Sequence, residues 1–111
     1  MGVISWDDFA KVDVRVGRIA AAEAFPEARK PAYRLTIDFG ELGTRRSSAQ
    51  ITKRYRPESL VGRQVVAVMN FPPKRIAGFR SEVLVLGVVV ADDDVVLLQP
   101  DQDVPPGKPI A

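Results

Sequence analysis

The sequence predicts a mainly β domain whose short strands close into a small barrel, with short helices and terminal extensions. Apolar residues alternate with polar ones in several short segments, and prolines and glycines separate those segments. The first segment also changes its apolar phase beside Gly17, as a strand does at a bulge. A bulge lets a strand bend around a barrel. We expect residues 1–111 to form a single domain with a small core.

A helical turn and a long strand are expected first. Ser5 stands where it would cap a brief helix that contains Trp6 and Phe9. Beyond this helix, apolar residues occupy positions 12, 14 and 16, and the apolar pattern resumes at Ile19 after the slip at Gly17. This pattern predicts a first strand that bends.

Two more strands follow a proline-containing break at residues 26–31. Every second residue from 33 to 39 is apolar, which is typical of a half-buried strand. After a turn at 41–43, the more polar residues 46–51 also alternate, so Arg46, Ser48 and Gln50 would share one face of a third strand. Such a polar face either binds a ligand or protects a sheet edge by its charge.

The second half of the chain predicts a helical connection, two apolar strands and a hairpin. Residues 51–60 would form a short helix that restarts at Pro57, with the cations of this connection pointing outward. The runs 65–69 and 83–90 are continuously apolar, so both faces of these strands should be covered and Leu86 should be buried. A chain this small has few elements for that purpose, which predicts a homodimer. Residues 95–98 would pair back across a turn at 91–94, and the proline-containing tail needs a surface on which to dock.

Charge is distributed unevenly along the chain. The net charge is +2, yet residues 44–90 hold nine basic and two acidic residues, a net +7, whereas residues 91–111 have a net charge of −4. A basic segment of this kind either attracts phosphate groups or forms ordinary solvated loops.

The composition argues against catalysis. The chain has neither His nor Cys, so the usual general base, the thiol nucleophile and the common zinc ligands are missing. Asp92, Asp93 and Asp94 are consecutive and would project in different directions, which favours a solvated turn over a metal site. Neither of the glycine-rich phosphate-binding motifs occurs. We expect no enzymatic activity, no cofactor and no metal.

The same features predict a cytoplasmic protein. No apolar run approaches the ~20 residues that cross a bilayer, and the first residues lack a basic region followed by an apolar stretch. The lack of cysteine fits a reducing compartment. We expect no insertion into a membrane.

Residues 70–81 predict a stiff binding loop. Phe71 and Phe79 flank two prolines, two cations and Ile76, and a loop stiffened by prolines loses little entropy on binding. Its phenylalanines would either stack on nucleobases while the cations neutralise phosphates, or plug the barrel end or a dimer seam.

Several segments resemble a known family when taken together. They are AQITKRY, NFPPKRIAGF and SEVLVLG, with WDDFAKVDVRVGRI near the start and VVLLQPD near the end. The chain resembles the small tRNA-binding domain that is appended to some aminoacyl-tRNA synthetases and also occurs alone. It is most similar to a free-standing bacterial branch described as an export-related chaperone. The resemblance implies an OB-fold, which is a five-stranded Greek-key β-barrel, in a homodimer that binds without catalysing.

The resemblance also implies site residues. Asn70, Ser81 and Glu82 match the RNA-binding motif of the family, and Arg75 matches a basic position. In an OB-fold, nucleic acid lies on the face of the second and third strands. The expected RNA-binding residues are Arg46, Ser48, Gln50, Lys53, Arg54, Asn70, Lys74, Arg75, Arg80, Ser81 and Glu82. The expected peptide-binding residues are Phe71, Ile76 and Phe79.

Two functions therefore remain open. In the first, the protein is an export-related chaperone whose homodimer binds unfolded preproteins near the subunit seam, with the export machinery as a further partner. In the second, it is an RNA-binding protein whose dimer recognises structured tRNA by shape and phosphate contacts. Binding through phosphates weakens steeply with salt, whereas binding through apolar burial changes little.

Overall fold

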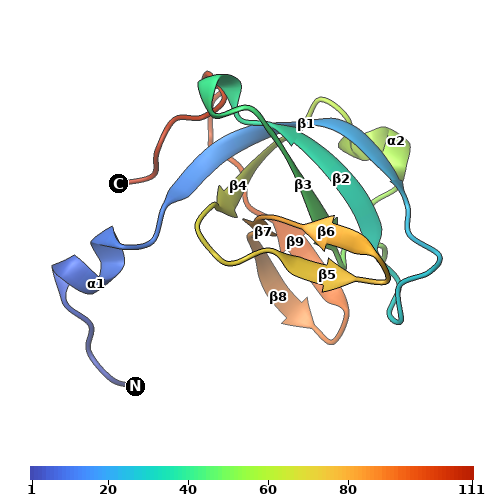
Figure 1. Cartoon of the computed structure of the whole chain (residues 1–111), viewed down its shortest axis with the longest axis horizontal. Helices are drawn as coiled ribbons and strands as arrows, with labels where there is room; N and C mark the ends of the chain where they lie inside the picture. The colour runs from blue at the N-terminus through green and yellow to red at the C-terminus, as the bar shows by residue number, and fades with distance from the viewer.

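The computed structural model describes all 111 residues, and strands dominate it (Figure 1). The helical elements are α1 (Trp6–Ala10), the 3-10 turn η1 (Gly40–Leu42) and α2 (Pro57–Leu60). The strands are β1 (Val14–Ala24), β2 (Tyr33–Asp38), β3 (Thr44–Ala49), β4 (Gln64–Val68), β5 (Lys74–Ile76), β6 (Phe79–Ser81), β7 (Leu84–Val85), β8 (Gly87–Ala91) and β9 (Asp94–Leu97). No helix reaches the length and apolar character of a membrane span.

Five strands form the nearly closed antiparallel barrel of the predicted OB-fold. Their order is β3-β2-β1-β4-β7, and β1 pairs with β4 along its first half and with β2 along its second half. The segment before β7 closes the barrel against β3. There the amide of Glu82 donates to the carbonyl of Arg46 at 2.8 Å, and Ser47 Oγ donates to the carbonyl of Val83 at 3.0 Å.

The core lies inside this barrel and follows the predicted alternation. Leu35 and Ile37 are completely buried on one side of β2, as is Phe39 just after it, while Arg34 and Asp38 lie on the other side. Ser47, Ala49 and Ile51 are likewise buried, so β3 presents Arg46 and Ser48 on its outer face as expected. The predicted N-terminal helix is also confirmed, since Ser5 and Asp8 form a reciprocal capping box.

The predicted bulge in β1 is confirmed, but its position was wrong. The register with β2 shifts between Ile19 and Ala21, beyond Gly17. The glycine has a different role, because a Cβ at this position would lie 2.5 Å from Ile37 Cγ2 and 2.6 Å from Phe39 Cε1. Gly17 therefore allows β2 side chains to pack tightly against the backbone of β1.

The expected strand over 83–90 is divided. Leu86 is half-buried rather than buried, and its amide donates to the carbonyl of Val66 while its own carbonyl accepts from Leu98. The chain thus passes from the barrel into the separate β8–β9 hairpin, which confirms the predicted turn at 91–94. Val88, Val89 and Val90 are 50%, 76% and 54% exposed, so this chain alone does not cover both faces of β8.

Residues 70–81, which we predicted to be a loop, include the β5–β6 hairpin. Lys74 faces Ser81 and Ile76 faces Phe79 across the two strands. Ala77 and Gly78 both have positive φ, 47° and 81°, as a tight two-residue turn requires. The hairpin lies in front of β3 in Figure 1.

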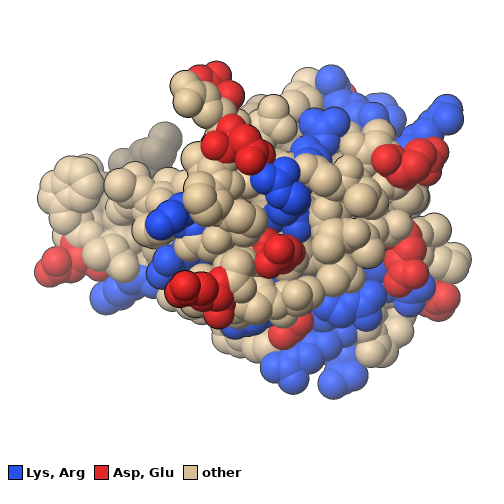
Figure 2. Space-filling view, turned by 90° about the horizontal axis from the view of Figure 1, so that it is seen from above, with Lys and Arg blue, Asp and Glu red and all other residues tan.

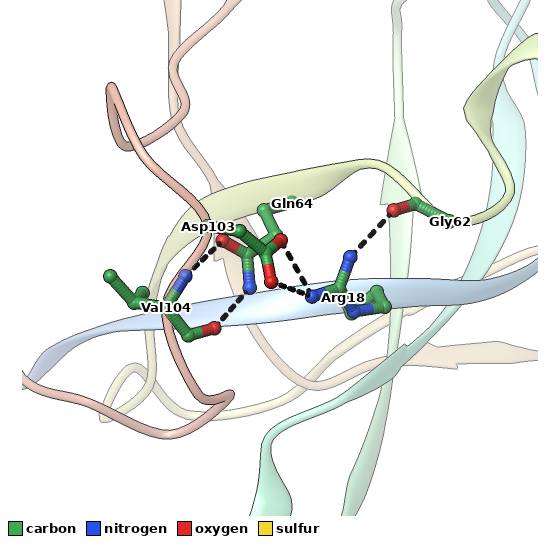
Figure 3. Close-up of polar contacts among 5 residues, drawn as sticks. All are labelled: Arg18, Gly62, Gln64, Asp103 and Val104. Carbon is green, nitrogen blue, oxygen red and sulfur yellow. Dashed lines mark hydrogen bonds and ion pairs between the residues drawn. The ribbon is translucent and has the colours of Figure 1, made fainter.

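The C-terminal tail docks along β1, which supplies the surface that we predicted the tail would need. The amide of Gly107 donates to the carbonyl of Val16 at 2.7 Å, and the amide of Val16 donates to the carbonyl of Lys108 at 3.0 Å. Figure 3 shows how the preceding residues are attached. Arg18 Nη2 lies 2.7 Å and 2.9 Å from the two carboxylate oxygens of Asp103, and the Gln64 side chain forms two hydrogen bonds with the backbone of Val104.

Candidate nucleic-acid interface

The most concentrated positive charge lies on the β5–β6 hairpin. Lys74, Arg75 and Arg80 line a shallow depression with Pro73, and none of the three cations forms an ion pair. Arg75 and Arg80 stand directly opposite each other on the two strands. Figure 2 shows Lys and Arg gathered along its lower edge, the side nearest the viewer in Figure 1. Like charges facing each other are unfavourable unless an anion lies between them.

Arg46 on β3 belongs to a neighbouring cluster. Its guanidinium carbon lies 4.7 Å from the centre of the Phe79 ring, on strand β6. Its Nη2 also lies 3.4 Å from Glu23 Oε1, on strand β1. Ser48, on the same strand, is half-exposed, and Gln50 follows the strand and is exposed.

The turn that follows β3 presents two predicted cations in different states. Lys53 is exposed and forms no ion pair, whereas Arg54 forms a bidentate ion pair with Asp94 at the start of β9. The hydrogen bond from Arg54 lowers the pKa of the Asp94 carboxyl, and the same bond raises the pKa of Arg54. Arg54 would therefore have to leave Asp94 in order to neutralise a phosphate fully.

The three residues carried over from the family motif make internal hydrogen bonds. Asn70 accepts from the amide of Asp13 at 2.9 Å and donates to the carbonyl of Lys11 at 2.6 Å. Ser81 Oγ accepts from the amide of Ser48 at 3.0 Å, and Glu82 Oε1 accepts from the amide of Arg46 at 3.0 Å. These side chains attach the N-terminal segment and close the barrel beside β3.

The predicted peptide-binding residues do not form one surface. Phe79 is buried and packs edge to face against Phe25, with ring centres 5.4 Å apart, and the half-buried Ile76 packs against the same cluster. Phe71 lies outside this cluster and is 56% exposed. The interpretation that Phe79 has a packing role is therefore favoured over base stacking, and Phe71 is the one predicted aromatic with an exposed ring.

Sequence reasoning missed Glu23 and Phe25 as members of the interface. The pattern places Arg34 on the polar face of β2, but only the strand register brings Glu23 of β1 opposite it. Phe25 follows β1 and lies beneath the Arg34 guanidinium, which is 5.2 Å from the ring centre. A shallow hollow next to it is lined by Ala24, Phe25, Pro26, Ala28, Arg29, Pro31, Ala32, Tyr33 and Thr52. No group of His, Cys, Asp or Glu residues is arranged to hold a metal ion.

Comparisons with known proteins show the family and the fold of this chain. The family described as "Putative tRNA binding domain" matches residues 14–109. The crystal structure of chaperone CsaA from Bacillus anthracis str. Ames is 60% identical, with a TM-score of 0.96 over 99% of this chain and 100% of that one. The CsaA chaperone protein from Picrophilus torridus is 51% identical, with a TM-score of 0.90 over 98% of this chain and 100% of that one.

Curated relatives include much longer proteins. A methionine–tRNA ligase of Methanococcoides burtonii is 39% identical over 105 residues, which is 95% of this chain and 15% of that protein. The chain thus spans about 15% of the length of such a ligase. The expected resemblance to a domain that occurs both alone and as part of synthetases is confirmed.

Proposed function

The chain belongs to the tRNA-binding domain family, and from this premise we propose that it binds structured tRNA without catalysing a reaction. The observation that carries the proposal is the facing pair Arg75 and Arg80 on the β5–β6 hairpin. Together with Lys74 these residues form a depression with three cations and no acidic partner. An RNA phosphate would relieve their mutual repulsion and accept hydrogen bonds from both guanidinium groups.

This interface is better suited to recognising the shape and phosphates of an RNA than to recognising its bases. Phe79 is buried, so the hairpin offers cations rather than a stacking platform. The exposed Lys53 and the outer face of β3 would extend the contact along the backbone of a folded RNA. Affinity should then depend mainly on the number of phosphates that are neutralised.

Titration of the protein with bulk tRNA at several salt concentrations tests the proposal. Affinity should fall steeply with salt, by roughly one logarithmic unit of slope for each neutralised phosphate. Lys74→Ala should weaken binding and reduce the slope by about one. Lys108→Ala is the matched control, because Lys108 is also exposed and without an ion pair but lies on the tail. A flat salt dependence, or equal effects of the two substitutions, would contradict the proposal.

A second candidate function is that of a chaperone for unfolded preproteins, which would make protein export its context. Two solved structures similar to this chain are described as chaperones. The chain also exposes apolar side chains, among them Phe71, Trp6 and the valines of β8. An unfolded preprotein should then bind with little salt dependence, and Phe71→Ala should weaken that binding but not tRNA binding. Salt-tolerant preprotein binding alongside feeble tRNA binding would make this the primary function.

We also propose that the protein acts as a homodimer in the cytoplasm, where tRNA is found. The exposed valines of β8 leave apolar side chains on both faces of this strand, and a second copy would cover at least one of those faces. Two basic hairpins per dimer would let one tRNA bind both subunits, which raises affinity through effective concentration. Measurement of the molar mass of the protein in solution tests the assembly.

A further inference from the structure

Glu23 occupies an unusual place between two arginines. Its Oε1 atom lies 3.1 Å from Arg34 Nε and 3.4 Å from Arg46 Nη2. The three residues come from β1, β2 and β3, so neighbouring strands of the barrel hold them. Glu23 faces Arg34 in the β1–β2 register, and Arg46 faces Thr36 in the β2–β3 register.

Both guanidinium groups are fixed from below by aromatic rings. Arg34 lies 5.2 Å from the centre of the Phe25 ring and Arg46 lies 4.7 Å from the centre of the Phe79 ring. The two rings pack against each other in a small apolar cluster beneath the cations. The arginines are therefore held in place, and little side-chain entropy would be lost when an anion binds between them.

Glu23 neutralises the charge of Arg34 and Arg46 only in part. One carboxylate faces two cations, so the cluster keeps one positive charge. Arg34 Nε is buried and has no hydrogen bond of acceptable geometry, although the carboxylate is near. The Glu23 side chain is 54% exposed, whereas the side chains of Arg34 and Arg46 are 29% and 45% exposed. Glu23 is thus the member of the cluster that can turn into solvent.

We propose that Arg34 and Arg46 form a phosphate-binding site that Glu23 occupies in the free protein. When RNA binds, one phosphate group takes the place of the carboxylate and Glu23 turns outward. This inference rests on the proposed RNA-binding function and adds to it a site on the sheet and a residue that limits affinity. The phosphate oxygens would accept from both planar guanidinium groups, which suit this anion.

Because Glu23 competes with any incoming anion, it affects which anions the two arginines can bind. A single small anion must displace Glu23 without other help, so it binds weakly. A folded RNA that already contacts the β5–β6 hairpin brings its phosphate at high effective concentration and can displace the carboxylate. Glu23 would therefore favour a polyanion of extended shape over free phosphate.

The test compares Glu23→Gln with Glu41→Gln. Both substitutions remove one negative charge, but Glu41 is exposed on η1 and forms no ion pair. In titrations with bulk tRNA, Glu23→Gln should bind about two- to fivefold more tightly than Glu41→Gln, the scale of one exposed ion pair. Adding Arg34→Ala to Glu23→Gln should abolish the gain.

A second measurement examines the site without RNA. Inorganic phosphate is titrated while the Nε–H signals of Arg34 and Arg46 are followed by NMR, and these signals should move at lower phosphate concentration in Glu23→Gln than in the unmodified protein. If the unmodified protein fails to bind tRNA but these signals respond, the proposed function fails and the anion site stands. Tight tRNA binding with equal behaviour of the two glutamine variants, or unresponsive arginine signals, would overturn the inference.

Discussion

The Asn70 side chain connects the N-terminal segment to the barrel. It holds the backbone of Lys11 and Asp13, which carries the projecting helix α1 into β1. A residue that matches an RNA-binding motif thus already uses both ends of its amide inside the protein. At the residue scale, the structural and the RNA-binding roles of Asn70 can be separated by measuring stability and affinity on the same variant.

Asn70→Ala should lower the free energy of unfolding by about 1 kcal/mol, because two hydrogen bonds are lost at a largely exposed position. Urea unfolding measures this change. Gln50→Ala is the control, since Gln50 is exposed and an exposed substitution changes stability by less than about 0.5 kcal/mol. A fully stable Asn70→Ala protein with lost tRNA affinity would show that Asn70 contacts RNA instead.

The ion pair between Arg54 and Asp94 predicts a pH effect. Arg54 lowers the folded-state pKa of Asp94 below its ordinary value of 3.8, so the pair stabilises the fold above that pH and loses its effect as the pH falls through the folded-state pKa. The stability difference between the unmodified protein and Asp94→Asn should therefore be constant near neutrality and shrink in acid. Asp92→Asn, at the same turn but without an ion pair, is the matched control. Acid and urea titrations followed by circular dichroism measure both.

At the scale of the element, the packing of β1 against β2 depends on the close approach of Ile37 and Phe39 to the backbone of Gly17. A Cβ at position 17 would lie 2.5 Å from Ile37 Cγ2, so Gly17→Ala forces β1 away from β2 or displaces core side chains. Overpacking of this kind costs about 1 to 3 kcal/mol. Gly2→Ala, which meets no atom within 4 Å, should leave stability unchanged. Unaltered urea unfolding of Gly17→Ala would mean that Ile37 and Phe39 can move aside.

Elements with a clear period were predictable from sequence, and irregular ones were not. The alternation in β2 and β3 fixed their buried faces because one residue of slip would have turned apolar side chains into water. The β5–β6 hairpin escaped prediction because prolines and cations mask its short strands, and its turn has Ala77 at positive φ in place of a typical turn residue. The division between β7 and β8 falls at Leu86, so Gly87 was the one residue in this apolar run that could have indicated it.

The sequence predicted which cations belong to the candidate site, but not which of them are paired with acidic residues. The basic composition of the middle segment indicated Lys74, Arg75 and Arg80, and the structure brings these three together. It also shows that Arg46 and Arg54 already have acidic partners, which come from β1 and β9. These partners lie far away in the sequence, so only the three-dimensional pairing reveals which cations are free.

At the scale of the whole molecule, the chain leaves an apolar surface on the β8–β9 hairpin. A small barrel fills its own interior, and the tail uses the free edge of β1, so neither can cover the valines of β8. Exposed valines on a two-stranded hairpin are unusual in a protein that stays alone in water. A second copy of this chain would bury them, which links assembly to the two basic hairpins that a tRNA would contact.

Val89→Glu should therefore give a folded monomer, because a charge at this 76% exposed position opposes burial in a subunit seam. Sedimentation measures the molar mass, and circular dichroism checks the fold. Val61→Glu is the matched control, since Val61 is 52% exposed but lies at the end of α2. The control should remain dimeric, and tRNA affinity should fall only in the monomer, which loses its second basic hairpin. A Val89→Glu dimer would place the seam elsewhere, and an unmodified protein that is monomeric would exclude the proposed assembly.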